Sequence, residues 1–397
     1  MKILYICSLF HPHQGGIETM VSELSASLKK NGGEAVILTK QFPSDLSFHE
    51  KIKGVRIVRF PIPHDKQSYV ALGKFLRQNE TILKSDLIHV VGFRHPLPII
   101  SWYLAKRWNI NIVGTICGGE IPLPMDRESA RVWRKGKYTT QPFLNLIDYL
   151  TTCSDFLKKQ LLENYPLLST TPKTLLVGIN LSDYLRLPAK KTARPYILSL
   201  RRLVPSKGID VLLKSYIAIV DKLPNLDLII AGTGPEEKKL KKLAEKAKLP
   251  DKIKFIGDIP LAKALGYLKS AFCTVVPSRS EGGGLVNIEA IALGCPVIAT
   301  DVGGVREYVG PGGLLIKKDD IKQLSKNILV LYNNSAKRNS IISKGKKFSL
   351  KFDWKIIFPK YLSLYRKEIR APHRQINLST GRELPKKSQL LLKWLSQ

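Results

Sequence analysis

Long apolar runs are missing from this sequence of 397 residues. No stretch reaches the roughly 18 to 20 consecutive apolar residues that a helix needs to cross a bilayer, so we expect a soluble or peripheral protein. The segment Met1–Phe10 imitates a signal peptide, but its apolar core is only eight residues long and no small-residue cleavage site follows it. We interpret this segment as a buried first strand.

Cysteine is also scarce. The five cysteines contain no C-x-x-C pair, and their odd number does not fit a complete disulfide framework. We therefore expect reduced thiols in a cytosolic protein. No Asp-x-Asp occurs, which removes the usual carboxylate cradle for a divalent cation on a sugar nucleotide. We predict chemistry that needs no metal and no other cofactor.

The shortage of acidic residues leaves 64 Lys and Arg against 32 Asp and Glu, a net charge of +32. Such an excess suits nucleic acid, an anionic membrane surface or acidic substrates. It is spread over residues 51–150, 201–250 and 351–397, which excludes a single basic arm. The sequence has no zinc-finger, helix-turn-helix or RNP signature, so we expect no nucleic-acid partner.

Apolar strand-like runs alternate with helical periodicity along the chain, which is typical of an α/β protein with parallel sheets. A basic, Pro-containing stretch at Arg186–Pro195 separates two such series. We predict doubly wound domains at residues 1–185 and 186–350, a helix at 351–370 and a basic amphipathic tail at 371–397. The expected strands are Ile3–Ser8, Ala35–Thr39, Leu87–Val91, Ile110–Thr115, Tyr149–Thr152, Tyr196–Leu200, Asp227–Ala231, Ile253–Ile256, Cys273–Val276 and Pro296–Thr300.

The segment Pro277–Ala290 is the richest in chemistry. An apolar strand ends there, three glycines form a turn without side chains, and a helix begins, so backbone N–H groups converge on a point that favours a diphosphate. Glu281 and Glu289 lie eight residues apart, so one carboxylate can reach a sugar while the other reaches along a nucleotide. A glycine-rich loop with two solvated carboxylates is the alternative. The turn and the start of the helix are Gly282, Gly283, Gly284, Leu285 and Val286.

Glu281 and Glu289 match the E-x7-E motif of retaining GT-B glycosyltransferases, and the chain resembles glycosyltransferase family 4 (glycosyl transferases group 1) in particular. The resemblance continues through Ala290–Gly304 and spans about residues 1–370. It implies two Rossmann-like domains that face a central cleft, with a C-terminal helix that crosses back to the first domain. It implies a UDP-, GDP- or ADP-sugar as donor, with Glu281 on the sugar hydroxyls and Glu289 on the ribose.

The segment Leu200–Leu203 followed by Lys207 resembles the family's G-R-L…K-G segment, in which Arg202 and Lys207 would hold the donor diphosphate. Two fixed cations stabilise the charge that grows on a departing diphosphate. Arg201 replaces the usual glycine, so we choose Arg202 rather than Arg201. In a chain this basic, a solvated pair of cations is the alternative.

Two further glycine turns match the family. Gly232 and Gly234 resemble a G-x-G-P turn beside the donor. Gly15 and Gly16 resemble the loop between the first strand and first helix, where Gly16 would let the backbone approach the donor and Gly15 would lie on the acceptor side. Plain turns before helices are the alternative.

Cys117 departs from the family pattern. Family members often carry a histidine in T-x-H-G, where this chain reads Thr115-Ile116-Cys117-Gly118. A thiol does not reproduce the hydrogen bonding of an imidazole. If that histidine helps to hold the donor sugar, this protein either uses a different donor or is slower than family members that carry the histidine. No histidine neighbours Cys117 in sequence, which disfavours a nucleophilic role.

Basic residues interleaved with a tryptophan follow Cys117, a composition that suits a helix on an anionic bilayer. A solvated loop is the alternative. The tail around Leu390–Leu392, with Lys393 and Trp394, is a second candidate for membrane contact. The residues expected on the acceptor or membrane side are Gly15, Cys117, Arg127, Arg131, Trp133 and Arg134.

We predict a retaining transferase that moves a sugar to a hydroxyl of a glycan or lipid-linked acceptor in cell-envelope synthesis, peripheral on the cytoplasmic face of an anionic inner membrane. No enzymic nucleophile is evident, which favours a front-face, oxocarbenium-like route. Three alternatives stay open: a sugar-nucleotide epimerase of this fold, a phosphorylase of this fold, and a catalytically silent sugar-nucleotide or lipid-binding protein.

Overall fold

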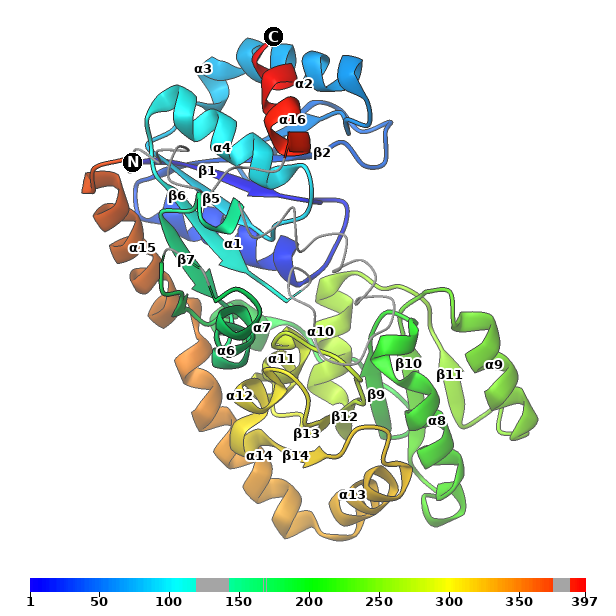
Figure 1. The fold of residues 1–397 in the computed structure, drawn as a ribbon. Coiled ribbons are helices and arrows are strands. Elements are labelled where there is room, and N and C mark those ends of the chain that lie inside the picture. The colour runs from blue at the N-terminus through cyan, green and yellow to red at the C-terminus, as the bar shows by residue number, and fades with distance from the viewer. Residues whose placement is uncertain (119–142, 167, 169, 374–385) are drawn as a thin grey trace. The chain divides into compact units, whose positions relative to one another are not determined.

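The computed structural model describes residues 1–118, 143–166, 168, 170–373 and 386–397 (Figure 1). The chain divides into two compact units. Unit 1 is formed by residues up to Gly178 and again from Trp354 onward, and unit 2 by Ile179–Asp353. Each has its own sheet and core.

Unit 1 is built on an eight-stranded sheet. Its elements, in chain order, are β1 (Lys2–Cys7), α1 (Gly16–Lys30), β2 (Glu34–Lys40), β3 (His49–Ile52), β4 (Val55–Phe60), α2 (Lys66–Gln78), α3 (Glu80–Leu83), β5 (Leu87–Val91), α4 (Leu97–Trp108), β6 (Ile112–Ile116), β7 (Tyr149–Thr152), α6 (Asp155–Asn164), β8 (Lys173–Thr174), α15 (Trp354–Arg370) and α16 (Lys386–Ser396). The strand order is β3-β4-β2-β1-β5-β6-β7-β8, and every pair is parallel except the β3–β4 hairpin.

Unit 2 is built on a six-stranded, wholly parallel sheet in the order β11-β10-β9-β12-β13-β14. Its helices and strands, in chain order, are α7 (Leu181–Arg186), β9 (Tyr196–Leu200), α8 (Ile209–Ile217), β10 (Asp227–Ala231), α9 (Glu237–Lys246), β11 (Ile253–Phe255), α10 (Leu261–Ser270), β12 (Cys273–Val276), α11 (Leu285–Ala292), β13 (Val297–Thr300), α12 (Val305–Val309), β14 (Gly313–Ile316), α13 (Ile321–Asn333) and α14 (Ser335–Ser349). Single 3-10 turns lie at Pro205–Lys207, Val220–Lys222, Gly310–Gly312 and Leu350–Phe352.

The predicted α/β class with two parallel sheets is confirmed. Central strands such as β1 are apolar on both faces because helices cover both sides of a parallel sheet, and Ile3 to Cys7 are all buried. The hairpin strand β3 escaped prediction because its sequence, His-Glu-Lys-Ile, is polar and mostly exposed. None of the five cysteines, all of which are described, forms a disulfide. Among the described residues, no helix is long and apolar enough to span a bilayer.

The change from unit 1 to unit 2 lies at Gly178 and Ile179, whereas the sequence suggested residue 185. The expected linker is instead attached to α10 of unit 2. Lys269 Nζ donates to the carbonyl oxygens of Leu185 and Leu187, both at 2.8 Å. The segment therefore belongs to unit 2 through bonds that composition alone does not reveal.

Helix α15 returns the chain to unit 1, where it packs on α1 and β5 (Figure 1). A buried polar network fixes it there. His89 of β5 has Tyr365 Oη 2.7 Å from Nδ1 and Thr115 Oγ1 2.7 Å from Nε2. Burial lowers the pKa of His89 to about 3, so its ring is neutral. The environment of His89 is therefore structural.

Helix α16 packs on α2 and α4. Leu391, Leu392 and Leu395 are buried, and Arg77 Nη1 donates to the Leu395 carbonyl at 2.9 Å. A Cβ on Gly73 would collide with that same carbonyl oxygen, so the glycine permits the close approach. The apolar face that we expected to contact a membrane is used inside unit 1 instead.

We expect Tyr365→Phe to lower the free energy of unfolding by about 1 to 3 kcal/mol, because one ring nitrogen of buried His89 loses its partner. Denaturant unfolding followed by circular dichroism measures this. The exposed Ser363→Ala, on the same helix, should stay within about 0.5 kcal/mol of the wild type. Equal stability of Tyr365→Phe and wild type would show that the bond does not hold α15 in place.

Candidate active site

The carboxyl edge of the unit 2 sheet has a topological switch point between β9 and β12. From β9 the chain builds β10 and β11 on one side, and then returns to add β12 on the other. Loops that leave such neighbouring strands diverge and open a crevice, which is where doubly wound sheets bind ligands. The loops concerned are Arg201–Gly208 after β9 and Pro277–Gly284 after β12.

Glu281 is the centre of the residues gathered at this point. Lys207 Nζ donates to Glu281 Oε1 at 2.7 Å, and Ser278 Oγ donates to the same oxygen at 2.8 Å. Arg201 forms an ion pair with that oxygen as well and donates to Ser278 Oγ at 2.9 Å. Three donors therefore converge on one carboxylate oxygen. Among the described residues, no hydrogen bond is made to the other oxygen, Oε2.

The sequence reasoning rejected Arg201 in favour of Arg202 and did not assign a role to Ser278. The side chain of Arg201 is 8% exposed, whereas Arg202 is exposed to solvent. Successive residues that leave a strand point to opposite sides, so only one of two adjacent arginines can face Glu281. The position of Arg201 directly after β9, and of Ser278 just after β12, could have marked both as site residues. The family pattern favoured Arg202 instead.

The cluster carries more positive than negative charge. Burial, together with the guanidinium groups of Arg201 and Arg202, holds the pKa of Lys207 well below its ordinary value. Burial lowers the pKa of Arg201 to about 10, and Arg202 acts in the same direction while Glu289 opposes it. An anion bound here would relieve this repulsion.

The glycines near Glu281 allow close backbone packing. Gly284 has φ +99°, a conformation that suits glycine, and α11 begins directly after it at Leu285 and Val286. Gly282 precedes Gly283, where an added Cβ would lie 2.8 Å from the Tyr308 ring. The turn that the sequence predicted before this helix is present.

Gly232 and Gly234 lie in the loop after β10, beside the loop after β9. A Cβ on Gly232 would collide with the carbonyl oxygen of Arg201, and one on Gly234 with that of Leu203. These glycines therefore let two loops pack backbone to backbone and help to place Arg201. A direct role at the donor stays a prediction.

Glu289 lies on α11 in a separate environment. It is 8% exposed, and Tyr184 Oη donates to its Oε1 at 3.3 Å. Burial raises the pKa of Glu289 to about 7, although Tyr184 and Arg201 act against the rise. The two carboxylates of the E-x7-E motif thus differ: Glu281 is surrounded by cations, and Glu289 is buried with a tyrosine.

Two of the residues expected on the acceptor side, Gly15 and Cys117, are described by the structure and lie at the carboxyl edge of the unit 1 sheet. Gly15 precedes α1, which begins at Gly16, and Glu18 folds back over Gly15 so that its Oε1 lies 3.1 Å from His13 Nδ1. Half-buried Cys117 follows β6, with Sγ 3.9 Å from the Thr115 carbonyl. Arg127, Arg131, Trp133 and Arg134 lie outside the described residues.

Comparison with known proteins identifies the family. The profile described as "Glycosyl transferases group 1" matches residues 185–348, and that of "Glycosyltransferase Family 4" matches residues 14–183. The chain belongs to glycosyltransferase family 4. It is therefore a glycosyltransferase with a nucleotide-sugar donor. In the part of the chain that is described, no group of three or more metal-ligating side chains occurs.

Relatives of this glycosyltransferase match over most of their length. An uncharacterized glycosyltransferase of Methanocaldococcus jannaschii is 29% identical, over 89% of this chain and 95% of the relative. A GDP-mannose-dependent monoacylated alpha-(1-6)-phosphatidylinositol monomannoside mannosyltransferase of Corynebacterium glutamicum is 25% identical, over 93% and 99%. The structure of a sucrose-phosphate synthase of Thermosynechococcus elongatus has a TM-score of 0.77 at 21% identity, over 92% and 99%, and shows the same fold.

We expect Glu289→Gln to remove a pH dependence of stability. The folded protein holds the Glu289 proton up to about pH 7, whereas an unfolded carboxyl releases it near 4.5. Stability of the wild type should therefore fall as pH rises from 4.5 to 7, by up to roughly 3 kcal/mol. Denaturant unfolding across this range measures it. Glu245→Gln, exposed on α9, should leave the slope unchanged, and parallel curves for Glu289→Gln and wild type would contradict the assignment.

Proposed function

We propose that this protein is a retaining transferase that moves a sugar from a nucleoside diphosphate sugar to an acceptor hydroxyl, with Glu281, Lys207 and Arg202 at the reacting groups. The observation that carries the proposal is the convergence of Lys207, Arg201 and Ser278 on one oxygen of Glu281. A solvated loop would not hold a carboxylate in one orientation with three donors.

Glu281 is oriented to bind the donor sugar. Because three protein donors occupy Oε1, the remaining oxygen Oε2 is available to accept hydrogen bonds from sugar hydroxyls. A carboxylate is an acceptor only, which suits a hydroxyl-bearing ligand. Arg201 and Ser278 act as positioning residues in this proposal, since they hold the carboxylate rather than touch the sugar.

Lys207 and Arg202 bind the diphosphate in this proposal. Arg201, Arg202 and Lys207 outnumber Glu281, and burial together with repulsion from the two arginines lowers the pKa of Lys207. A diphosphate restores the balance of charge, and as it leaves the sugar it gains negative charge that fixed cations stabilise. The same phosphate oxygen can receive the acceptor proton, so the step needs no enzymic nucleophile.

The acceptor is proposed to be a glycan or lipid-linked hydroxyl compound at an anionic membrane surface. Two observations support it. The Corynebacterium relative acts, by its name, on a phosphatidylinositol mannoside. The charge of +32 also far exceeds what a diphosphate site requires.

A screen of UDP-, GDP- and ADP-sugars by thermal shift tests the donor class. A ligand at 100 times its Kd stabilises a protein by about 2.7 kcal/mol, so one of the three nucleotides should raise Tm by several degrees. Lys207→Ala should weaken binding of the matching nucleoside diphosphate about 10- to 100-fold, because a charged hydrogen bond is lost. Lys242→Ala, exposed on α9, is the control. No shift with any of the three donors would refute the proposed donor class.

Glu281→Gln separates sugar recognition from diphosphate binding. Transfer of labelled sugar to an acceptor should fall about 10- to 100-fold, whereas affinity for the nucleoside diphosphate should stay equal or rise, because a negative charge leaves the site. Calorimetry and transfer kinetics measure the two effects. A parallel loss of both would mean that Glu281 only maintains the loop.

Product analysis of the wild type addresses the alternatives. A labelled sugar that appears on an added acceptor supports a transferase. An epimerised nucleotide sugar, or transfer to inorganic phosphate, would instead indicate an epimerase or a phosphorylase. Nucleotide binding without any turnover would indicate a silent binding protein.

A further inference from the structure

The solvent face of α15 is strongly basic. At 100° per residue, its exposed residues fall within one stripe of the helix, and its buried aromatic and aliphatic residues fill the opposite side. The only acidic residue of the helix, Glu368, is buried. We call this stripe the basic face. Its members are Lys355, Ile356, Pro359, Lys360, Ser363, Arg366, Lys367 and Arg370.

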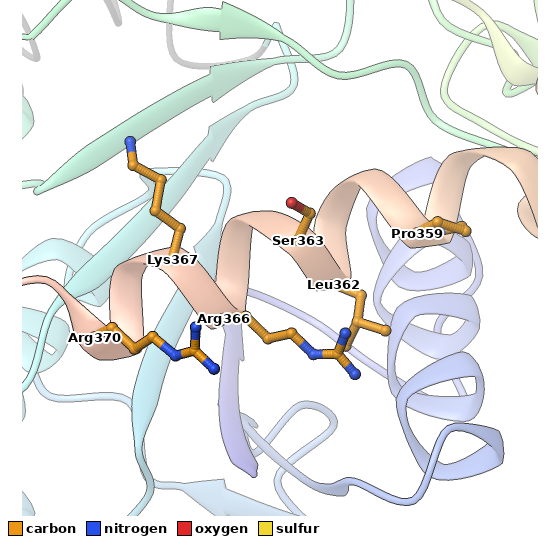
Figure 2. Close-up of a pocket in the computed structure, with 6 residues that line it drawn as sticks. All are labelled: Pro359, Leu362, Ser363, Arg366, Lys367 and Arg370. Carbon is orange, nitrogen blue, oxygen red and sulfur yellow. The ribbon is translucent and has the colours of Figure 1, made fainter.

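Part of the basic face is hollowed into an open groove of about 540 Å³, lined by Pro359, Leu362, Ser363 and three cations. Figure 2 shows Arg366 and Arg370 extending on one side of the helix and Lys367 on the other. Arg366 and Arg370 are one turn apart, and among the described residues neither has an ion-pair partner. Lys367 lies 5.5 Å from the centre of the Tyr149 ring and 3.7 Å from Glu368.

Arg366 and Arg370 are the cations of the basic face that bear on a ligand, because unpaired cations on a rigid helix indicate a polyanionic partner. The stripe as a whole holds five cations and no acidic residue, so its net charge is positive. Each Lys or Arg near an anionic bilayer contributes to binding, and the contributions add.

The apolar members of the basic face favour a bilayer over a nucleic acid. Ile356 is 48% exposed, and Pro359 is exposed beside it. Aliphatic residues among cations suit the headgroup region of a membrane. Proteins that bind single-stranded nucleic acid without sequence preference stack the bases on exposed aromatic rings. The aromatic residues of α15 are instead buried. They are Trp354, Phe358, Tyr361 and Tyr365.

We propose that the basic face of α15 docks unit 1 onto an anionic lipid bilayer, with Arg366 and Arg370 in contact with lipid phosphates and Ile356 at the headgroup boundary. The biological purpose of the docking rests on the proposed function, because docking would bring the enzyme to a lipid-linked acceptor. It does not involve the residues of the donor site. Vesicle binding is measured without donor or acceptor, so each proposal can fail alone.

Co-sedimentation with vesicles tests the docking. The full-length wild type should bind an equimolar mixture of phosphatidylcholine and phosphatidylglycerol, should bind pure phosphatidylcholine much less, and should be released by high salt. The double variant Arg366→Gln and Arg370→Gln should bind about 30-fold more weakly, because two cations are lost. Arg366→Lys with Arg370→Lys keeps both charges and should retain binding within about threefold.

A matched control lies in unit 2. Lys238 and Lys242 are exposed on α9, one turn apart, and Lys238→Gln with Lys242→Gln makes the same change of net charge. This variant should bind vesicles like the wild type. Nucleoside diphosphate binding should be equal in all four proteins, which also confirms that each is folded.

Three results would overturn the docking. The first is equal vesicle binding by the α15 glutamine variant and the wild type. The second is an equal loss in the α9 control, which would mean that only net charge matters. The third is that the wild type binds a single-stranded oligonucleotide but no vesicles, and that the α15 glutamine variant loses this oligonucleotide binding. That result would assign the basic face to nucleic acid.

Discussion

The carboxylate of Glu281 has to be both neutralised and left open to a ligand, and the candidate site of unit 2 depends on how this is achieved. All three protein donors meet at Oε1. The loops after β9 and β12 supply these donors because the sheet reverses its direction of growth between those two strands. A strand order without this switch would place Arg201 and Ser278 in loops that do not meet.

The sequence predicted the class of fold, most central strands and the loop that carries Glu281. These features are local, since apolar runs and glycine turns are visible within a few residues. The polar strand β3 and the attachment of Leu185 and Leu187 to Lys269 were not visible, because they depend on partners far along the chain. Arg201 escaped for a related reason: which of two adjacent arginines turns inward is decided by the neighbouring strand.

The two carboxylates of the E-x7-E motif show how position sets chemistry. Glu281 lies in a loop among cations, whereas Glu289 lies within a helix beside Tyr184, and burial raises its pKa. Spacing alone treats them as equivalent. The charge surplus divides in a similar way, because Arg201 and Lys207 are paired with Glu281 while the cations along α15 face solvent.

The bond between His89 and Tyr365 joins residues that are 276 positions apart. Among the described residues, unit 2 is one continuous stretch, whereas unit 1 is completed by α15 and α16, which come after it in the sequence. During synthesis on the ribosome, the second unit can therefore close its core before the first. Until Tyr365 emerges, the strand that carries His89 has a polar group without its native partner, and the half of the chain that is made first is the last to finish folding.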